Sequence, residues 1–449
     1  MINKFLKNNI NKAILIILLI GLGFNIFYLL NTPYNIRTHD VDGHIKYIEY
    51  VAQSLKIPHP DVCWECHQAP LYYILAAIVY KASVLLGFGD KNTIYFILQS
   101  FSVFLFLIFS TVSIFIFKKI FIDNKNEEIK NTPFKNYIFY LVSFLFVFWP
   151  TNIMHSVRIT NDTLFYVFYA LVIFFLIRWL EKNNNNNFYF SILFSFLAFI
   201  TKTHGVMAFA LVASCVIFNF IKDKKRLNNL KFYFKISSIL ITVFLIGFFA
   251  SRLGARTIDK INGEGQKSNL MVWNVAGLNE RLFTDNKVKN YIYFDTKIFL
   301  TEPYIDNWND KYGRQYFWNF LLKNSLFGEF FFKGIMAENI AIGISALLLM
   351  MIFWIIGSML FSVKESFKNN FVLKINAVFL LFSFLAHRII LSANGDFRFI
   401  LPILISFCSF AGVGVLEYRR KGVKNMEYIG CGILSLFIIL SMLFFIVGI

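Results

Sequence analysis

Long apolar stretches alternate with short polar segments along the whole chain. Many windows of about 20 residues carry no charged side chain, which is the length of α-helix that crosses the hydrocarbon layer of a bilayer. The pattern predicts an all-α polytopic membrane protein, with one membrane-embedded domain over residues 1–449 and about 11 transmembrane helices. The predicted spans are 13–30, 93–117, 136–150, 163–180, 188–201, 205–220, 232–250, 333–361, 371–391, 398–415 and 427–448.

Lysine and arginine residues gather in alternate loops between these spans. Lys4, Lys7 and Lys12 precede the first apolar run, and no small-residue cleavage site follows it. We therefore expect a retained helix with a cytoplasmic N-terminus. The loops that this order places inside are then all basic, as the positive-inside rule requires. Loops 31–92 and 251–332 are predicted to lie on the periplasmic or outer face of the cytoplasmic membrane.

The stretch 70–87 is also apolar enough to cross the membrane. If it crossed, the basic loop 118–135 would lie outside and every later loop would be inverted. We therefore expect 70–87 to form a juxtamembrane or re-entrant helix on the outer side, with protein covering its backbone. The long loop 251–332 is expected to act as a lid or an acceptor-binding loop. It carries a group of acidic residues, Glu302, Asp306 and Asp310.

The net charge of +18 would suit a nucleic-acid partner if it were gathered on one surface. The basic residues instead sit in short loops between apolar spans, and no separate basic domain exists, so no nucleic acid is expected. The hydrophobic fraction of 57% makes the lipid bilayer the expected surroundings. The topology also places all seven histidines outside. That suits an enzyme acting at the outer face, although short inside loops filled with Lys and Asn leave little room for His.

The stretch from Arg37 to Tyr73 directly follows the first span and contains four of the seven histidines. Asp40 and His44 are four residues apart, so they would share one face of an interfacial helix. The Asp40 carboxylate could take a proton from an acceptor hydroxyl or hold a divalent metal through oxygen. Alternatively, Asp40 only caps the helix, a role that suits Asp42 better.

The run 63–67, Cys-Trp-Glu-Cys-His, matches the spacing of a c-type haem attachment site. No second haem ligand is obvious, so haem is not expected. A zinc site with His59 and His67, a disulfide in an oxidising compartment, and two free thiols remain open. The three remaining cysteines fall inside spans, where they are expected to pack as small hydrophobic residues.

Further candidates lie at the predicted outer membrane boundaries. Arg158 and Asp162 flank the start of the fourth span, which Asp162 could instead cap. Lys202 could bind a phosphate as a point charge or only snorkel. Arg398 could clamp a phosphate through two N–H groups, unless it only pairs with Asp396. The candidate substrate-binding residues are Asp42, His44, Glu65, His67, Tyr72, Arg158, Asp162, Lys202, His204, Arg388 and Arg398.

The order of these motifs resembles the C-type fold of integral-membrane glycosyltransferases. The nearest group by pattern is that of the protein mannosyltransferases and aminoarabinose transferases (glycosyltransferase family 39-like). In that group Ala69 is often a proline, and oligosaccharyltransferase relatives carry a fuller acidic motif around the position of Asp162. The matching residues lie between about 30 and 415: Asp40, the run 67–73 (His-Gln-Ala-Pro-Leu-Tyr-Tyr), Asn161-Asp162, Thr201-Lys202-Thr203, and 396–399 (Asp-Phe-Arg-Phe) with Pro402.

The resemblance implies transfer of a sugar from a polyprenyl-phosphate donor to an envelope acceptor, either lipid, glycan or protein, at the outer face. Lys202 and Arg398 would neutralise the leaving phosphate, and Asp40 would take the proton of the attacking hydroxyl in a displacement that inverts the anomeric carbon. A divalent metal, Mg²⁺ or Mn²⁺, could bind at Asp40 and Asp162. The alternative is a transporter or lipid flippase, which should carry mid-membrane charges or inverted repeats. Neither is visible in the sequence.

Overall fold

The computed structural model describes residues 2–123, 133–182, 184–223, 229–251, 283–361 and 370–449. The regular structure of these residues is helical, and they form no β-strand beyond an isolated bridge between Phe283 and Ala393. The chain is therefore all-α, as its hydrophobic pattern predicts. Part of the predicted lid loop, 252–282, lies outside the described residues.

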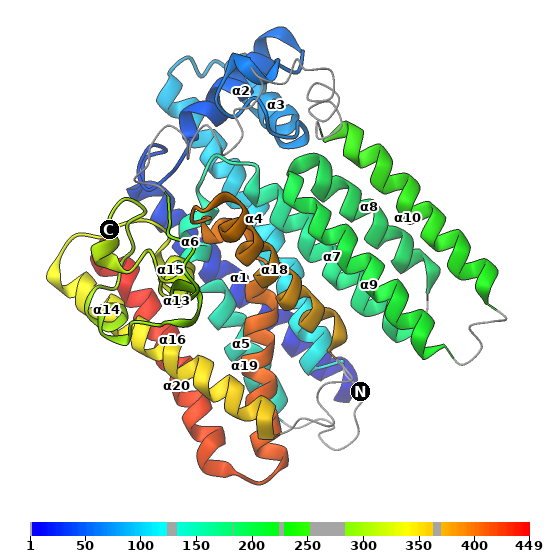
Figure 1. Cartoon of the computed structure of the whole chain (residues 1–449), viewed down its shortest axis with the longest axis vertical. Coiled ribbons are helices and arrows are strands. Elements are labelled where there is room, and N and C mark those ends of the chain that lie inside the picture. Colours follow the sequence, from blue (N-terminus) through cyan, green and yellow to red (C-terminus); the bar gives the residue numbers. More distant parts are fainter. Residues whose placement is uncertain (1, 124–132, 183, 224–228, 252–282, 362–369) are drawn as a thin grey trace.

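The first part of the chain places two shorter helices at one end of the bundle. The long apolar helices α1 (Ile2–Asn31) and α4 (Lys91–Phe121) pack against each other. Between them in sequence, α2 (Val41–Ser54) packs against α3 (Leu71–Leu85). Figure 1 shows this pair at the top, beyond the ends of the long helices. With 15 residues, α3 has a length that suits a juxtamembrane helix.

The next apolar segment is broken, although the sequence predicts one continuous span over 136–150. α5 (Pro133–Val147) is followed by α6 (Pro150–Ser156), which is turned by 53°. Proline has no backbone N–H and its ring clashes with the preceding turn, but it suits the first position of a helix. Pro150 therefore starts a new helix instead of continuing α5. The bend directs the chain into α7 (Asp162–Lys182).

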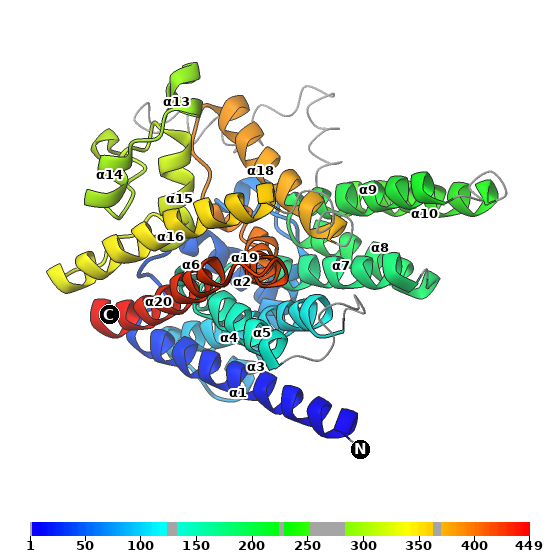
Figure 2. The same ribbon diagram turned by 90° about the horizontal axis from the view of Figure 1, so that it is seen from below.

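Four helices form a group on one side of the molecule. α7 packs along α8 (Asn185–Thr201), and both α9 (Val206–Lys222) and α10 (Leu230–Ala250) pack against α8. The two views in Figures 1 and 2 agree that these helices extend together away from the rest. The turn between α8 and α9 is tight because Gly205 lies against the α8 backbone, where a β-carbon would clash.

The described part of the predicted lid, 283–332, contains three short α-helices and a 3-10 turn, Asp310–Tyr312. The α-helices are α13 (Val288–Ile292), α14 (Thr296–Thr301) and α15 (Phe317–Phe327). α15 packs against α6 and against the 3-10 turn Phe397–Phe399, while α14 packs against α16 (Ile335–Phe361). The segment is thus anchored on the bundle at two places.

The last four long helices complete the bundle. α16 packs against α20 (Lys424–Gly448), and α18 (Phe371–Leu391) packs against α9 and α19 (Ile403–Arg420). The sequence predicts a span over 398–415, but Phe397–Phe399 form a 3-10 turn and α19 starts after Pro402. Arg398 therefore lies in a turn outside the helix.

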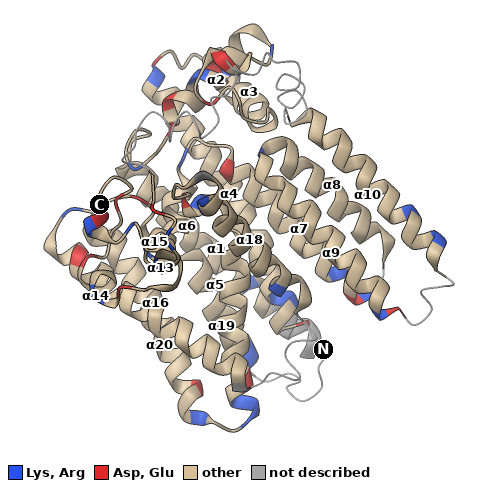
Figure 3. Ribbon diagram, in the orientation of Figure 1, with Lys and Arg blue, Asp and Glu red and all other residues tan. Residues whose placement is uncertain are grey.

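Eight helices of the described part are long and apolar enough to cross a membrane, and the bent pair α5 and α6 would make a ninth. The predicted count of about 11 is not confirmed, because α8 and α19 do not reach this standard. Large apolar side chains such as Leu15, Phe234 and Phe353 are exposed on the outer surface, which requires a lipid environment. Figure 3 shows Lys, Arg, Asp and Glu mainly at helix ends and loops. The protein is a membrane protein.

Candidate active site

The loop after α1 presents Asp40 in an unusual backbone conformation. Arg37 and Asp40 have φ angles of 52° and 59°, the left-handed region that non-glycine residues rarely occupy. Asp40 stands at the N-cap position of α2, but its side chain makes no capping hydrogen bond. The capping role considered for Asp40 is therefore wrong. Strained backbone of this kind persists where the surrounding contacts fix it, often at functional sites.

Arg398 joins three carboxylates from distant parts of the sequence. Its Nη2 donates to Asp40 Oδ2 at 3.1 Å, and its Nε lies 3.3 Å from Asp396 Oδ2 and 3.9 Å from Asp162 Oδ2. The indole N–H of Trp64 donates to the other Asp40 oxygen at 3.2 Å. Asp40 and Asp162, which sequence analysis proposes for one site with Arg398, thus both lie against its guanidinium.

Two further cations balance the charge of this cluster. Lys202 forms a buried salt bridge with Asp162, and Arg158 Nη1 lies 3.7 Å from Asp396 Oδ2. The ion-pair network therefore consists of three carboxylates and three cations. Its members are Asp40, Asp162, Asp396, Arg158, Lys202 and Arg398.

Backbone contacts hold the network at the ends of several helices. Asp162 is the first residue of α7, and Lys202 follows the last residue of α8. The Tyr166 hydroxyl donates to the Arg398 carbonyl at 2.8 Å, and Asn161 Nδ2 donates to the Thr201 carbonyl at 3.1 Å. The charges thus lie at helix ends, where a membrane boundary would be, and not at mid-helix.

The charges in the network keep its carboxylates ionised. Burial alone would raise the pKa of Asp40, but the Arg398 guanidinium and the nearby His44 and His39 together outweigh burial, and the pKa is lowered. The same opposition lowers the pKa of Asp396 to about 2. Burial would lower the pKa of Arg398, yet the three surrounding carboxylates raise it. Asp40 is therefore an anion at neutral pH, but a weak base for as long as Arg398 remains paired with it.

Arg158 carries N–H groups that the network does not use. Its side chain is buried and its Nη1 donates to His155 Nδ1 at 3.0 Å. Its Nε and Nη2 have no hydrogen-bond partner among the described residues. Unpaired buried donors are rare in proteins and call for a water or an anion. Such donors beside Asp396 and Arg398 make this the best-suited place in the cluster for a further anionic group.

Cys63 and Cys66 form a disulfide. The sequence left open a zinc site, a disulfide or two free thiols, and the structure has the disulfide. The disulfide closes a short loop. In this loop the Trp64 indole contacts Asp40, and Glu65 packs on Gly43. A β-carbon at Gly43 would lie 2.8 Å from the Glu65 side chain, so only glycine fits there. Glu65 is buried, and its Oε2 has no hydrogen-bond partner among the described residues.

Other predicted residues surround the network without joining it. The imidazole of His44 is buried and its Nδ1 is hydrogen-bonded to the Tyr73 hydroxyl at 2.7 Å. Tyr72 is fully buried beside Tyr73. His204 stacks on Phe399 with ring centroids 4.9 Å apart. These residues form the walls around the charged cluster.

Three further predicted residues stand outside the ion pairs of the network. His67 Nδ1 is hydrogen-bonded to the Trp64 carbonyl at 2.7 Å, which keeps it within its own loop. Asp42 is exposed on α2 and lines a cavity together with Asp40, but it forms no ion pair with the network among the described residues. Arg388 is buried and donates to the Gln315 carbonyl at 2.8 Å. Arg388 therefore ties α18 to segment 283–332 and lies apart from the contacts of Arg398.

Sequence analysis missed a partly buried pair, His39 and Glu329, at the edge of the network. Glu329 Oε2 lies 3.4 Å from His39 Nε2, and Asn307 Nδ2 donates to Glu329 Oε1 at 2.8 Å. Burial, and then Asp396, raises the pKa of Glu329 to about 8. Burial, and then Arg158, lowers the pKa of His39 to about 4. At neutral pH both groups are therefore uncharged, and their 3.4 Å contact is not a salt bridge.

No feature of the local sequence singles out Glu329 from the other acidic residues of its loop. Sequence analysis pointed instead to Glu302, Asp306 and Asp310, of which two make local ion pairs. Glu302 lies 3.4 Å from Lys311, and Asp310 pairs with Arg314 at 2.5 Å. The signal that would have found Glu329 is its burial, which depends on tertiary packing.

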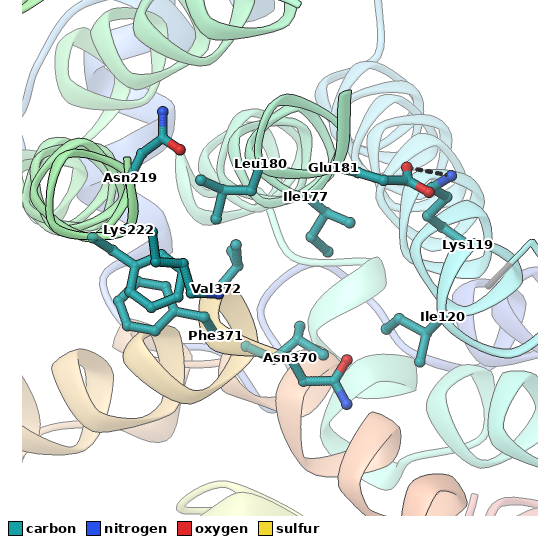
Figure 4. Close-up of a pocket in the computed structure, with 12 residues that line it drawn as sticks. Lys119, Ile120, Ile177, Leu180, Glu181, Asn219, Lys222, Asn370, Phe371 and Val372 are labelled. Carbon is teal, nitrogen blue, oxygen red and sulfur yellow. Dashed lines mark ion pairs between the residues drawn. The ribbon is translucent and has the colours of Figure 1, made fainter. Parts of the chain in front are cut away.

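A cavity of about 370 Å³ opens beside Asp40. Its lining is largely polar and includes the Trp64 indole, so a hydroxyl-bearing molecule could approach the Asp40 carboxylate there. It is lined by Asn35, Thr38, Asp40, Val41, Asp42, Gly43, Lys46 and Trp64. A second pocket, shown in Figure 4, lies at the opposite ends of α7 and α9.

The residues fit a divalent metal poorly. Asp40 and Asp162, the predicted ligands, both face the Arg398 guanidinium, and Asp162 is also paired with Lys202. A metal ion would have to approach against these cations. Among the described residues, no group of three or more His, Cys, Asp or Glu side chains is arranged to hold a metal. We therefore derive no step that uses one.

No protein-family model matches the sequence, and a search of curated proteins finds no match either. The chemistry of the site consequently rests on its own residues. They provide an ionised carboxylate next to a polar cavity, an arginine that bridges three acids, and unpaired buried N–H groups.

Proposed function

We propose that the chain is a membrane glycosyltransferase that moves a sugar from a polyprenyl-phosphate donor to an envelope acceptor at the outer face of the cytoplasmic membrane. One observation carries this proposal. Arg398 bridges three acids. The Asp40 carboxylate borders an open cavity, and the other two acids pair with Lys202 and Arg158. A base and a group of cations within one cluster at helix ends suit attack on a sugar phosphate at a membrane boundary.

The donor would keep its prenyl chain among the apolar helices and place its phosphate at the network. The phosphate adds negative charge beside Arg398, Lys202 and the free N–H groups of Arg158. It then competes with Asp40 for Arg398. As the guanidinium turns toward the phosphate, the pKa of Asp40 returns toward its ordinary value and the carboxylate becomes a better base. Donor binding thereby activates Asp40.

The transfer is a single displacement. The acceptor hydroxyl, bound in the cavity beside Asp40, attacks the anomeric carbon while its proton passes to Asp40. The bond between that carbon and the phosphate oxygen breaks, and polyprenyl phosphate leaves with its charge stabilised by Arg398 and Lys202. The anomeric configuration is inverted. The order of motifs shared with C-type glycosyltransferases supports the same assignment.

The test uses the full chain in lipid nanodiscs with a polyprenyl-phosphate donor labelled in its sugar. We expect release of polyprenyl phosphate together with a labelled acceptor, and loss of both products in Asp40→Asn. Asp61→Asn, an exposed acid of the same loop, serves as the matched control and should retain activity. In proteoliposomes, movement of intact donor across the bilayer without cleavage would instead identify a flippase and overturn the proposal.

A further inference from the structure

A second pocket lies at the far end of the helices that carry the ion-pair network. It has a volume of about 260 Å³ and is formed by the last turns of α4, α7 and α9 and the first turn of α18 (Figure 4). The network lies instead at the first turn of α7. The 21 residues of α7 separate the two sites by about 30 Å, the thickness of a hydrocarbon layer.

The polar groups of this pocket leave one cation without a counter-charge. Lys119 Nζ pairs with Glu181 Oε2 at 2.5 Å, so these two charges cancel. Lys222 has no ion-pair partner among the described residues, and its Nζ lies 4.3 Å from the centroid of the Phe218 ring. The side chains of Asn219 and Asn370 add amide groups to the wall (Figure 4). The pocket therefore offers one ammonium and several N–H donors to a ligand with about one negative charge.

The rest of the wall is apolar and continuous with the membrane-facing surface. Phe218 stacks on Phe371 with ring centroids 3.7 Å apart. Ile217 and Ile221 flank these residues on α9, and both are more than half exposed on the outside of the bundle. A ligand bound to Lys222 therefore has an apolar surface beside it for a hydrocarbon chain. A water-soluble phosphate would leave that surface unused.

We propose that this pocket binds the phosphate head group of an anionic phospholipid from the leaflet opposite the candidate active site. The lipid phosphate contacts Lys222 and the two asparagine amides, and an acyl chain lies along the exposed isoleucines of α9. Basic pockets between membrane helices recognise anionic head groups in this way. The bound lipid fastens the end of α9 to the start of α18, two helices that pack against each other.

The test compares lipids of different charge on the purified full chain in a neutral detergent. Phosphatidylglycerol should raise the melting temperature and give one retained lipid by native mass spectrometry, whereas phosphatidylcholine should do neither. Inorganic phosphate at millimolar concentration should give no shift, because it has no chain to bury. A shift with phosphate as large as that with phosphatidylglycerol would mean a soluble ligand and would overturn the lipid assignment.

Two variants locate the binding. Lys222→Gln should weaken the apparent Kd for phosphatidylglycerol about fivefold, the loss expected for one lysine near an anionic lipid. Asn370→Asp, which adds a negative charge to the wall, should weaken it at least as much. Lys424→Gln removes an exposed lysine outside the pocket and should bind lipid as the unmodified chain does. Equal effects of Lys222→Gln and Lys424→Gln would show that only general surface charge attracts the lipid.

Discussion

The two ends of α7 carry the same kinds of charge in different surroundings. At its start, Asp162 is 1% exposed and pairs with Lys202 inside a balanced network. At its end, Glu181 is 37% exposed and pairs with Lys119, while the neighbouring Lys222 has no ion-pair partner in the described part of the chain. Breaking a buried pair costs about 3–5 kcal/mol because a charge is left without compensation, whereas an exposed pair contributes about 0–1 kcal/mol. Burial, and not residue type, decides whether these charges fix structure or remain available to a ligand.

The substitution Asp40→Asn should have the largest effect, and on activity alone. The carboxamide keeps the shape of the side chain, and Asp40 is 33% exposed, so the unfolding free energy should change by less than about 1 kcal/mol. An amide cannot take the acceptor proton, so the rate of sugar transfer should fall by about 10²–10⁴. Initial rates and unfolding in detergent measure the two quantities. Unchanged turnover would remove Asp40 from the mechanism.

Lys202→Met should produce the largest loss of stability. The change leaves Asp162 buried without its main partner and should lower the unfolding free energy by about 3–5 kcal/mol. Adding Asp162→Leu removes the stranded charge as well, so the double variant should recover most of that stability while remaining inactive. Denaturant titration of the purified proteins measures both. A double variant no more stable than the single one would mean that packing, and not charge, accounts for the loss.

The His39–Glu329 pair predicts how stability depends on pH. The pKa of Glu329 is raised from 4.5 to about 8, so the folded state binds a proton that the unfolded state has released. The stability that this provides is complete below about pH 4.5 and is lost as pH rises through about 8. Glu329→Gln should therefore reduce the fall in unfolding free energy over that window by more than about 1.4 kcal/mol, the equivalent of one pKa unit.

His39 acts at the acidic side of the same window. Its pKa is lowered from 6.5 to about 4, so its contribution is present above about pH 6.5 and is lost as pH falls through about 4. The control for Glu329→Gln is Glu302→Gln in the same loop, which should keep the pH profile of the unmodified chain. Identical pH profiles for Glu329→Gln and the unmodified protein would show that Glu329 is ionised in the fold.

The smallest effect is expected at the exposed end of α7. Lys119→Gln should change the unfolding free energy by less than about 1 kcal/mol in lipid-free detergent, because water can solvate Glu181 once its partner is gone. The same denaturant titration as for Lys202→Met gives a direct comparison. If Lys119→Gln lowered the unfolding free energy as much as Lys202→Met does, the two ends of α7 would not differ in how strongly their ion pairs stabilise the fold.

The long helices could be predicted from the sequence because a run of apolar residues needs no tertiary information. α7, α9 and α20 lie within two or three residues of their predicted spans. The break at Pro150 and the late start of α19 were missed, since hydropathy averages over single prolines. Local chemistry at membrane boundaries pointed to Asp40, Asp162, Lys202 and Arg398, and the structure joins them, although their roles remain predictions. The sequence could not show that Arg388 lies apart from the network or that Glu329 lies at its edge, because long-range packing decides the contacts of both residues.

The contact between Asp40 and Arg398 spans 358 residues, which sets the order in which the network is completed during synthesis. At a synthesis rate of about 5–20 residues per second, Arg398 is made roughly 20–70 s after Asp40. Lys202 lies only 40 residues after Asp162, so it is made within about 2–8 s of Asp162. The nascent chain therefore neutralises Asp162 early and leaves Asp40 without its arginine until nearly the whole protein has been made. A chain that stops before the turn Phe397–Phe399 has no Arg398 and hence no bridge between its acids, so the network is complete only when this late turn has been made.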